Sequence, residues 1–141
     1  MIYAVTISTK NRRTLSAPSR TVVLDALRHF HGRRYELIAA CIMPDHVHFL
    51  WQPWPKDREA TGEPVFWSLS ELLASIKSFT VHEIDRLEHT KGSVWEKESF
   101  DRFIRSDHDL QEKFDYILRN PWDAKNRRTG RGLSLGLDSR R

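Results

Sequence analysis

The segment 35–52 constrains the fold more than any other part of the sequence. Two apolar runs, "RYELIAACIM" and "HVHFLWQ", are separated by a short turn of Pro44 and Asp45. In the second run Val47, Phe49 and Trp51 alternate with the other side chains, which is the two-residue period of a half-buried strand. The pattern predicts a β-hairpin in which His46 and His48 project side by side, about 6.6 Å apart along the strand, from the face opposite those apolar residues.

The flanking patterns extend this hairpin into a complete domain. Before the hairpin they predict a strand in "IYAVTIST" and a helix in "RTVVLDALRHFHG" that stops at Gly32. After the hairpin they predict a loop in "PWPKDREATGEP" and a helix in "SLSELLASIKSFTVHEIDRLEH" capped by Ser70. A strand or strand pair in "SVWEKESFDRFIR" and a helix in "SDHDLQEKFDYILRN" complete the order. The last helix has to end near Asn120, because Pro121 disfavours helical geometry in the residue before it. The order predicts a ferredoxin-like (RRM-like) α+β fold, an antiparallel sheet with packed helices, over residues 1–124.

Charge is unevenly distributed along the 141 residues. Residues 1–34 hold seven Lys or Arg and one Asp, and residues 125–141 hold six Lys or Arg and one Asp, whereas the middle of the chain is acidic. Basic ends of this kind suit contact with a polyanion, although taken alone they are more typical of an ordinary solvated surface. The last 17 residues are expected to form a flexible basic tail.

Other features of the composition limit the class of protein. The longest uncharged apolar run, "LIAACIM", is far too short for a membrane helix, and no stretch resembles a signal peptide. Cys41 is the only cysteine, which excludes an internal disulfide and a cysteine-based zinc site. These features predict a cytoplasmic bacterial protein without membrane attachment.

The paired histidines are candidate ligands of a metal ion. Two neutral imidazoles on one strand face can bind a cation together, while the alternative is a polar pair on an exposed sheet face. In the last helix Tyr116 and Asn120 are four residues apart and so share one face. An amide oxygen from Asn120 suits Mg²⁺ or Mn²⁺, and a nearby cation would activate the phenol of Tyr116 as a nucleophile. Taken alone, Tyr116 is more typical of an amphipathic packing residue with its hydroxyl at the rim of the core.

Three motifs in one order strengthen the functional interpretation. The segments "CIMPDHVHFLWQP", "SVWEKESFDRFIRSDHDL" and "FDYILRNPW", with a weaker match in "LSELLASIKSFT", resemble the single-tyrosine HUH nucleases, and among them the REP-associated tyrosine transposases. The resemblance implies the HUH nuclease fold and a metal-dependent endonuclease and strand transferase acting on single-stranded DNA beside REP-type hairpins. It assigns the metal to His46, His48 and Asn120, and it makes Tyr116 the nucleophile that forms a 5′-phosphotyrosine link.

The sequence also departs from the family pattern. Many relatives follow the Asn-Pro pair with a Val-Arg-Ala-Gly-like run, whereas this chain continues "NPWDAKNRRTG". Relatives with Asn at the position of Asp45 are common, and here Asp45 is a candidate partner that orients His46. These differences affect the expected target sequence and the role of the tail more than the chemistry.

Candidate DNA contacts follow from the basic and aromatic residues. Single strands are held by cations and by aromatic stacking platforms. The candidate phosphate contacts are Arg12, Arg13, Arg33, Arg34, Arg102, Arg105, Arg119, Arg127 and Arg128, and the candidate stacking residues are Trp54, Trp67 and Trp122. The expected partner is hairpin-containing single-stranded DNA, bound by a monomer or a homodimer. Two alternatives stay open, a non-catalytic nucleic-acid-binding module and a metal-dependent hydrolase that uses an activated water.

Overall fold

A computed structural model describes residues 1–58, 62–119 and 134–136. The main sheet has five strands, β1 (Tyr3–Ser8), β2 (Tyr35–Ile42), β3 (His46–Pro53), β6 (Phe100–Phe103) and β7 (Ser134–Gly136). The helices are α1 (Ala17–His29), α2 (Leu69–Glu88) and α3 (Asp107–Leu118), with a short 3-10 turn, η1 (Lys10–Arg12), after β1. A separate hairpin consists of β4 (Pro55–Arg58) and β5 (Pro64–Phe66).

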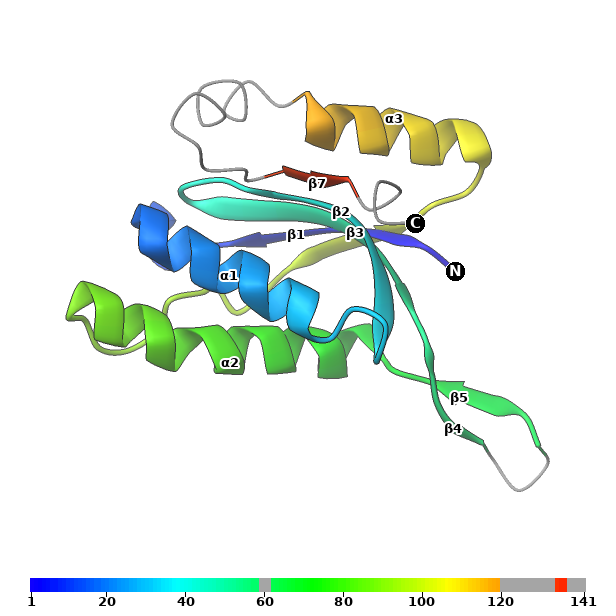
Figure 1. Cartoon of the computed structure of the whole chain (residues 1–141), viewed down its shortest axis with the longest axis horizontal. Helices are drawn as coiled ribbons and strands as arrows, with labels where there is room; N and C mark the ends of the chain where they lie inside the picture. The colour runs from blue at the N-terminus through cyan, green and yellow to red at the C-terminus, as the bar shows by residue number, and fades with distance from the viewer. Residues whose placement is uncertain (59–61, 120–133, 137–141) are drawn as a thin grey trace.

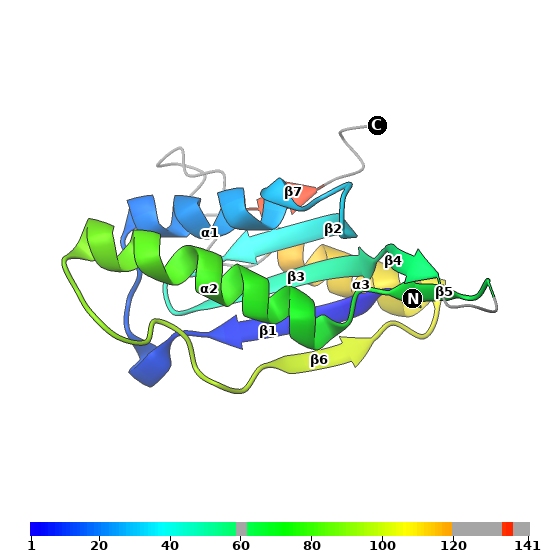
Figure 2. The ribbon, with the colours of Figure 1, turned by 90° about the horizontal axis from the view of Figure 1, so that it is seen from below.

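The strands lie in the order β6-β1-β3-β2-β7, and every pairing is antiparallel. Helices α1 and α2 cover one face of this sheet, and α3 lies on the other (Figures 1 and 2). The first four strands in this order, with α1 and α2 between them along the chain, form the ferredoxin-like β-α-β-β-α-β plan. The predicted fold class is therefore confirmed.

A large core fills the space between the sheet and the helices α1 and α2. Val47, Phe49 and Trp51 point into it from β3, as their alternation predicts, and all three are fully buried. Helix α1 contributes Val23 and Leu27 to the same core. A smaller core under α3 consists of Ala39, Cys41, Leu50 and Ile117. Strand β3 therefore supplies apolar side chains to both faces, and its histidines lie on the α3 face.

Local signals set where the helices begin and end. Helix α1 begins after Ser16, whose hydroxyl accepts a hydrogen bond from the Ser19 amide at 3.2 Å. The turn that follows the helix includes Gly32 at a φ of 82°, a conformation that costs glycine little. Helix α2 begins two residues earlier than predicted, because Ser68 rather than Ser70 caps it. Ser68 and Glu71 form a complete capping box.

Two predictions about the connections need correction. The segment 53–64 was expected to be a loop, but it contains most of the β4–β5 hairpin, which projects from the body of the molecule (Figure 1). Within the predicted tail of 125–141, residues Ser134–Gly136 form β7 and pair with β2, which the sequence did not indicate. The rest of that tail lies outside the described residues. In the part of the chain that the structure describes, no helix combines the length and the apolar character needed to cross a membrane.

Candidate metal and nucleophile site

The two histidines lie next to each other on the α3 face of the sheet. Because successive side chains of a strand point to opposite faces, Val47 is buried in the large core while His46 and His48 point the other way. Their ring centroids are 4.6 Å apart, with the ring planes at 78° to each other. The pair is therefore close enough for both imidazoles to share one ligand.

Each histidine is oriented by a hydrogen bond at Nδ1. The Nδ1 atom of His46 lies 2.7 Å from the carboxylate Oδ1 of Asp45, and the Nδ1 atom of His48 lies 2.9 Å from the Thr6 hydroxyl. Partners of this kind fix the ring orientation of metal-binding histidines. With both Nδ1 atoms engaged, a cation shared by the two rings would be bound through Nε2.

Sequence reasoning missed Thr6. Its place on the same strand face as Ala4 is visible in the alternation of the first strand. Its pairing with His48 depends on the register between β1 and β3, in which Thr6 lies opposite His48. The periodicity of a single strand does not determine its register with a neighbouring strand. The sequence therefore indicated the face on which Thr6 lies but not its pairing with His48.

Burial and neighbouring charges set the protonation of the site. Burial, and then the neighbouring His46, lower the pKa of His48 to about 4, so this imidazole is neutral at pH 7 and keeps a lone pair for a metal. Burial acts to raise the pKa of Asp45, but the hydrogen bonds and charges of His46 and Arg12 outweigh it, and the pKa lies below its usual value. At pH 7 the site therefore combines a neutral His48, which contacts the Thr6 hydroxyl, with an ionised Asp45, which contacts His46.

Tyr116 reaches the histidine pair from α3. Its ring centroid lies 5.6 Å from that of His48, and 55% of the residue is exposed. The next residue, Ile117, is buried in the smaller core against Leu50 and Cys41, which fixes the helix face that meets the sheet. The structure thus brings Tyr116 beside the pair of His46 and His48, which lies about seventy positions earlier in the sequence.

The beginning of α3 is held to the edge strand β6. The Ser106 hydroxyl accepts a hydrogen bond from the Asp109 amide at 3.1 Å and so caps the helix. Arg102 on β6 donates to both carboxylate oxygens of Asp109, at 2.7 and 3.1 Å. Such paired contacts have a defined geometry, so they fix the angle at which the tyrosine helix crosses the sheet.

A cleft of about 570 Å³ opens beside the candidate nucleophile. It lies between α3 and the strands β1 and β6, and its lining includes Thr6, His48, Phe100, Lys113 and Tyr116. The cleft therefore gives a ligand access to one side of the phenol and to one of the two histidines.

The loop after β1 packs against the turn that leads into His46. The Thr9 amide donates to the Asp45 carbonyl at 2.9 Å, and the Leu15 amide donates to the Pro44 carbonyl at 2.7 Å. Arg12 forms an ion pair with the Asp45 carboxylate at 2.7 Å, although 75% of its side chain is exposed. Asn11 and Arg12 have φ values of 54° and 57°, which are unusual for residues other than glycine.

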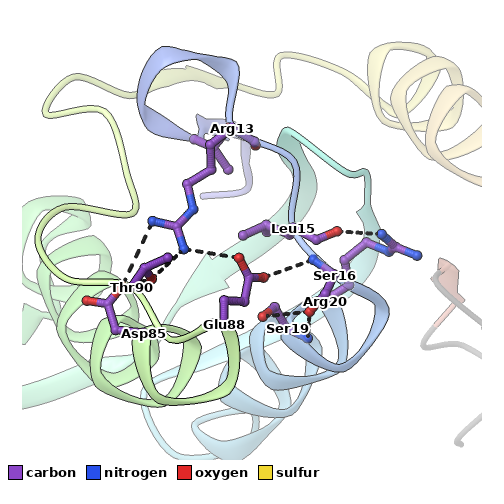
Figure 3. A network of polar contacts seen from close by, with 9 residues as sticks. Arg13, Leu15, Ser16, Ser19, Arg20, Asp85, Glu88 and Thr90 are labelled. Atoms are coloured by element: carbon purple, nitrogen blue, oxygen red, sulfur yellow. Dashed lines mark hydrogen bonds and ion pairs between the residues drawn. The ribbon is translucent and has the colours of Figure 1, made fainter.

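The same loop is anchored to the end of α2 by a polar network (Figure 3). Glu88 accepts hydrogen bonds from the Arg13 guanidinium at 3.1 Å and from the Ser16 amide at 2.9 Å. Arg13 also donates to the Thr90 hydroxyl at 3.0 Å. The network connects the large-core helix α2, through the loop, to the carboxylate that orients His46.

The other arginines predicted to contact DNA fall into three groups. Arg13 and Arg102 are engaged in the ion pairs described above, and Arg119 lies 3.9 Å from Asp115. Arg33 and Arg34 precede β2, which places them at the end of the sheet opposite His46. Arg34 stacks over the rings of Phe30 and Trp67, and Arg105 lies over the ring of Phe103.

Several predicted residues cannot be placed. Asn120, Trp122, Arg127 and Arg128 lie outside the described residues. Among residues 1–58, 62–119 and 134–136 there is no group of three His, Cys, Asp or Glu side chains arranged to hold a metal ion. The described part of the site therefore brings two histidines together, and the binding of a metal by His46, His48 and Asn120 remains a prediction.

Comparisons with known proteins agree with the motifs. The chain is 27% identical over 88 residues to a Haemophilus influenzae protein named "Putative REP-associated tyrosine transposase". The match covers 62% of this chain and 49% of the relative, so the chain spans about half the length of the curated relative it matches. No family model matches the sequence.

Solved structures share the fold. A REP-associated tyrosine transposase bound to a REP hairpin superposes with a TM-score of 0.61 at 21% identity, covering 94% of this chain and 81% of that one. A crystal structure of a "putative transposase" from Deinococcus radiodurans gives a TM-score of 0.54 at 19% identity, covering 83% and 88%. The resemblance to the REP-associated tyrosine transposases that the three motifs indicate is therefore confirmed.

Proposed function

We propose that this protein is a tyrosine transposase, a metal-dependent endonuclease and strand transferase that acts on single-stranded DNA beside hairpins. The observation that carries the proposal is the position of the Tyr116 ring, 5.6 Å from His48 and on the same sheet face as His46. The names of the similar proteins support it, since they are transposases and one is bound to a REP hairpin. A DNA substrate also agrees with action in a bacterial cytoplasm.

The histidine pair fits a divalent cation. Asp45 and Thr6 hold the two rings by Nδ1, which is the arrangement that leaves Nε2 of both for a metal. We propose that His46, His48 and Asn120 hold Mg²⁺ or Mn²⁺. When bound there, the cation supplies Lewis-acid polarisation of a phosphate oxygen and stabilises a phenolate.

In the proposed reaction Tyr116 attacks the scissile phosphodiester through its phenolic oxygen. The new bond joins this oxygen to phosphorus, and the bond between phosphorus and the 3′ oxygen breaks. The phenol loses its proton to solvent, and the departing 3′ oxygen takes one up as a hydroxyl. The downstream strand is then attached to the protein by its 5′ phosphate. The reverse attack by a 3′-hydroxyl of another strand restores a phosphodiester, which is strand transfer.

The arginines are proposed phosphate contacts with unequal availability. Arg12 is the best placed, because its side chain is mostly exposed and pairs with the Asp45 carboxylate, which also contacts His46. Arg33, Arg34, Arg105 and Arg119 are proposed to follow the strand or hairpin away from the site. Arg102 and Arg13 hold elements of the fold, and the basic residues of 125–141 are proposed to contact the hairpin. Residues 1–124 form the proposed catalytic domain, active as a monomer or a homodimer.

A covalent adduct is the result that tests the proposal. The protein is incubated with hairpin-bearing single strands and Mg²⁺ or Mn²⁺, and the products are resolved on a denaturing gel. A label at the 3′ end is expected to move to the protein band, because the tyrosine keeps the 5′ phosphate of the downstream fragment. A label at the 5′ end is expected in a shorter DNA strand.

Matched variants identify the nucleophile. Tyr116→Phe is expected to abolish the adduct, whereas Tyr3→Phe removes a hydroxyl from the opposite face of the sheet and is expected to leave it unchanged. His48→Ala is expected to reduce adduct formation by several hundredfold while DNA binding persists. Cleavage without an adduct, or full activity in Tyr116→Phe, contradicts the proposal and points to hydrolysis by an activated water.

A further inference from the structure

We infer that the cleft beside Tyr116 seats one unpaired base of the DNA strand and that Phe100 is the surface on which this base stacks. The inference rests on the proposed function and identifies the part of the substrate that this cleft binds. Phe100 is the first residue of β6, and 81% of it is exposed. A phenyl ring exposed to this extent within a cleft is available to a ligand.

The sheet register aligns Phe100 with the candidate site. Phe100 lies opposite Thr6 on β1, and Thr6 lies opposite His48 on β3, so the three side chains form one row on the α3 face. Two strand spacings of about 4.8 Å each separate Phe100 from His48, and their sum of about 10 Å is about the extent of one nucleotide. A phosphate held at the histidines would therefore place a neighbouring base over the phenyl ring.

The charges of the cleft favour a base over a second phosphate. Arg102 and Lys113 line it, but both contact the carboxylate of Asp109, at 2.7 and 3.4 Å. Glu112 adds a negative charge to the same wall. A groove that follows the DNA backbone needs uncompensated cations, whereas an aromatic ring in a nearly neutral cleft suits the face of a base.

The edge strand contains a matched control for this role. Phe103 is also exposed, at 42%, but it lies opposite Tyr3 and packs against that ring on the other face of the sheet. Truncation of either phenylalanine removes an exposed ring from β6. Truncation of Phe100 alone alters the cleft.

A binding cycle between protein and DNA variants tests the inference. Hairpin-bearing strands are made with single abasic positions, moved one at a time through the unpaired segment. Their affinities are measured by fluorescence anisotropy in a Tyr116→Phe background, so that cleavage does not interfere. Phe100→Ala is expected to weaken binding of the complete strand about tenfold. Phe103→Ala is expected to change it less than twofold, and Phe100→Trp to restore parental affinity.

One abasic position is expected to weaken binding about tenfold when Phe100 is present and to have no further effect in Phe100→Ala. Affinity of Phe100→Ala within twofold of the parent, or an abasic effect that is the same in both proteins, overturns the inference while adduct formation by Tyr116 stands. Coupling between Phe100 and one base without any adduct supports the base site and rejects the proposed nuclease. Failure of the parent to bind these strands overturns both.

Discussion

The two faces of the sheet differ in how much apolar surface covers them. On the face under α1 and α2, Val47, Phe49 and Trp51 of β3 are fully buried in the large core. On the other face the buried cluster is small, and the same strand presents His46 and His48 beside a cleft. One strand thus belongs to a dense core and to a polar site, and its two-residue period separates the two roles.

The comparison shows which face of the sheet supplies most of the stability and which face holds the candidate site. Apolar burial is the main source of folding free energy, so the face under α1 and α2 supplies most of it. Within α3, all of whose residues are described, Ile117 is the one buried residue. The tyrosine helix therefore contributes less to stability, and contacts at its ends, such as the Arg102–Asp109 pair, set its position.

The largest expected difference between the faces comes from one substitution made on each. Ile76 of α2 and Ile117 of α3 are both buried, in the large and the smaller core. Ile76→Ala is expected to lower the free energy of unfolding by about 4 kcal/mol and Ile117→Ala by about 2 kcal/mol, because fewer neighbours surround the second cavity. Urea unfolding followed by circular dichroism measures both. Equal losses would show that α3 is as firmly packed as α2.

A smaller effect is expected from Tyr35, which is buried in the large core. Its hydroxyl donates to the Leu27 carbonyl at 2.6 Å, and Tyr35→Phe is expected to cost about 1 kcal/mol. Burial raises the pKa of Tyr35 above its ordinary value. Because the folded-state pKa is raised, the contribution of this phenol to stability is fully present below about pH 10. It falls as the pH rises further, since the unfolded chain then releases the proton and the folded chain does not. Thermal unfolding from pH 8 to 11 is expected to show a shallower decline in Tyr35→Phe.

The smallest effect is expected on the α3 face, at Asp109. The hydrogen bonds from Arg102 and from the Arg105 amide lower the pKa of this carboxyl. A lowered folded-state pKa gives stability that is present above about pH 4 and lost as pH falls through the folded-state value. Asp109→Asn is expected to lower the melting temperature less than Tyr35→Phe at pH 7, and to flatten the decline between pH 4 and 2. An unchanged acid profile would show that the pair contributes nothing measurable.

Much of the fold was predictable because its signals are periodic and local. The alternation of β3 placed His46 and His48 on one face, and the helical stripes located α1, α2 and α3 to within a few residues. The prediction of Ser70 as the cap was wrong, because it followed the apolar stripe that begins at Leu72 and not the capping box that Ser68 forms with Glu71, two residues before Ser70. The β4–β5 hairpin was missed because its prolines and charges are typical of a loop, although an isolated edge hairpin tolerates both.

The site was less accessible to sequence reasoning, because it depends on contacts between distant segments. Helical spacing placed Tyr116 on the same face as Asn120, and the family resemblance supported the connection of that face to the histidines. The Thr6–His48 bond depends on strand register, and the ion pairs of Arg13 and Arg102 depend on where α2 and α3 begin and end. An arginine in a sequence does not reveal whether its partner is a phosphate or a carboxylate.

The single cysteine of the sequence has a practical consequence. Cys41 is fully buried in the smaller core, where Ile117 of α3 packs against the same cluster. Its thiol can react with a bulky aromatic disulfide reagent only when that cluster opens. Because no other cysteine competes, the labelling rate of the unmodified protein reports how often the tyrosine helix lifts from the sheet. A rate faster than global unfolding would show that the cluster opens locally, and the same measurement with added single-stranded DNA would show whether this ligand slows or speeds the opening.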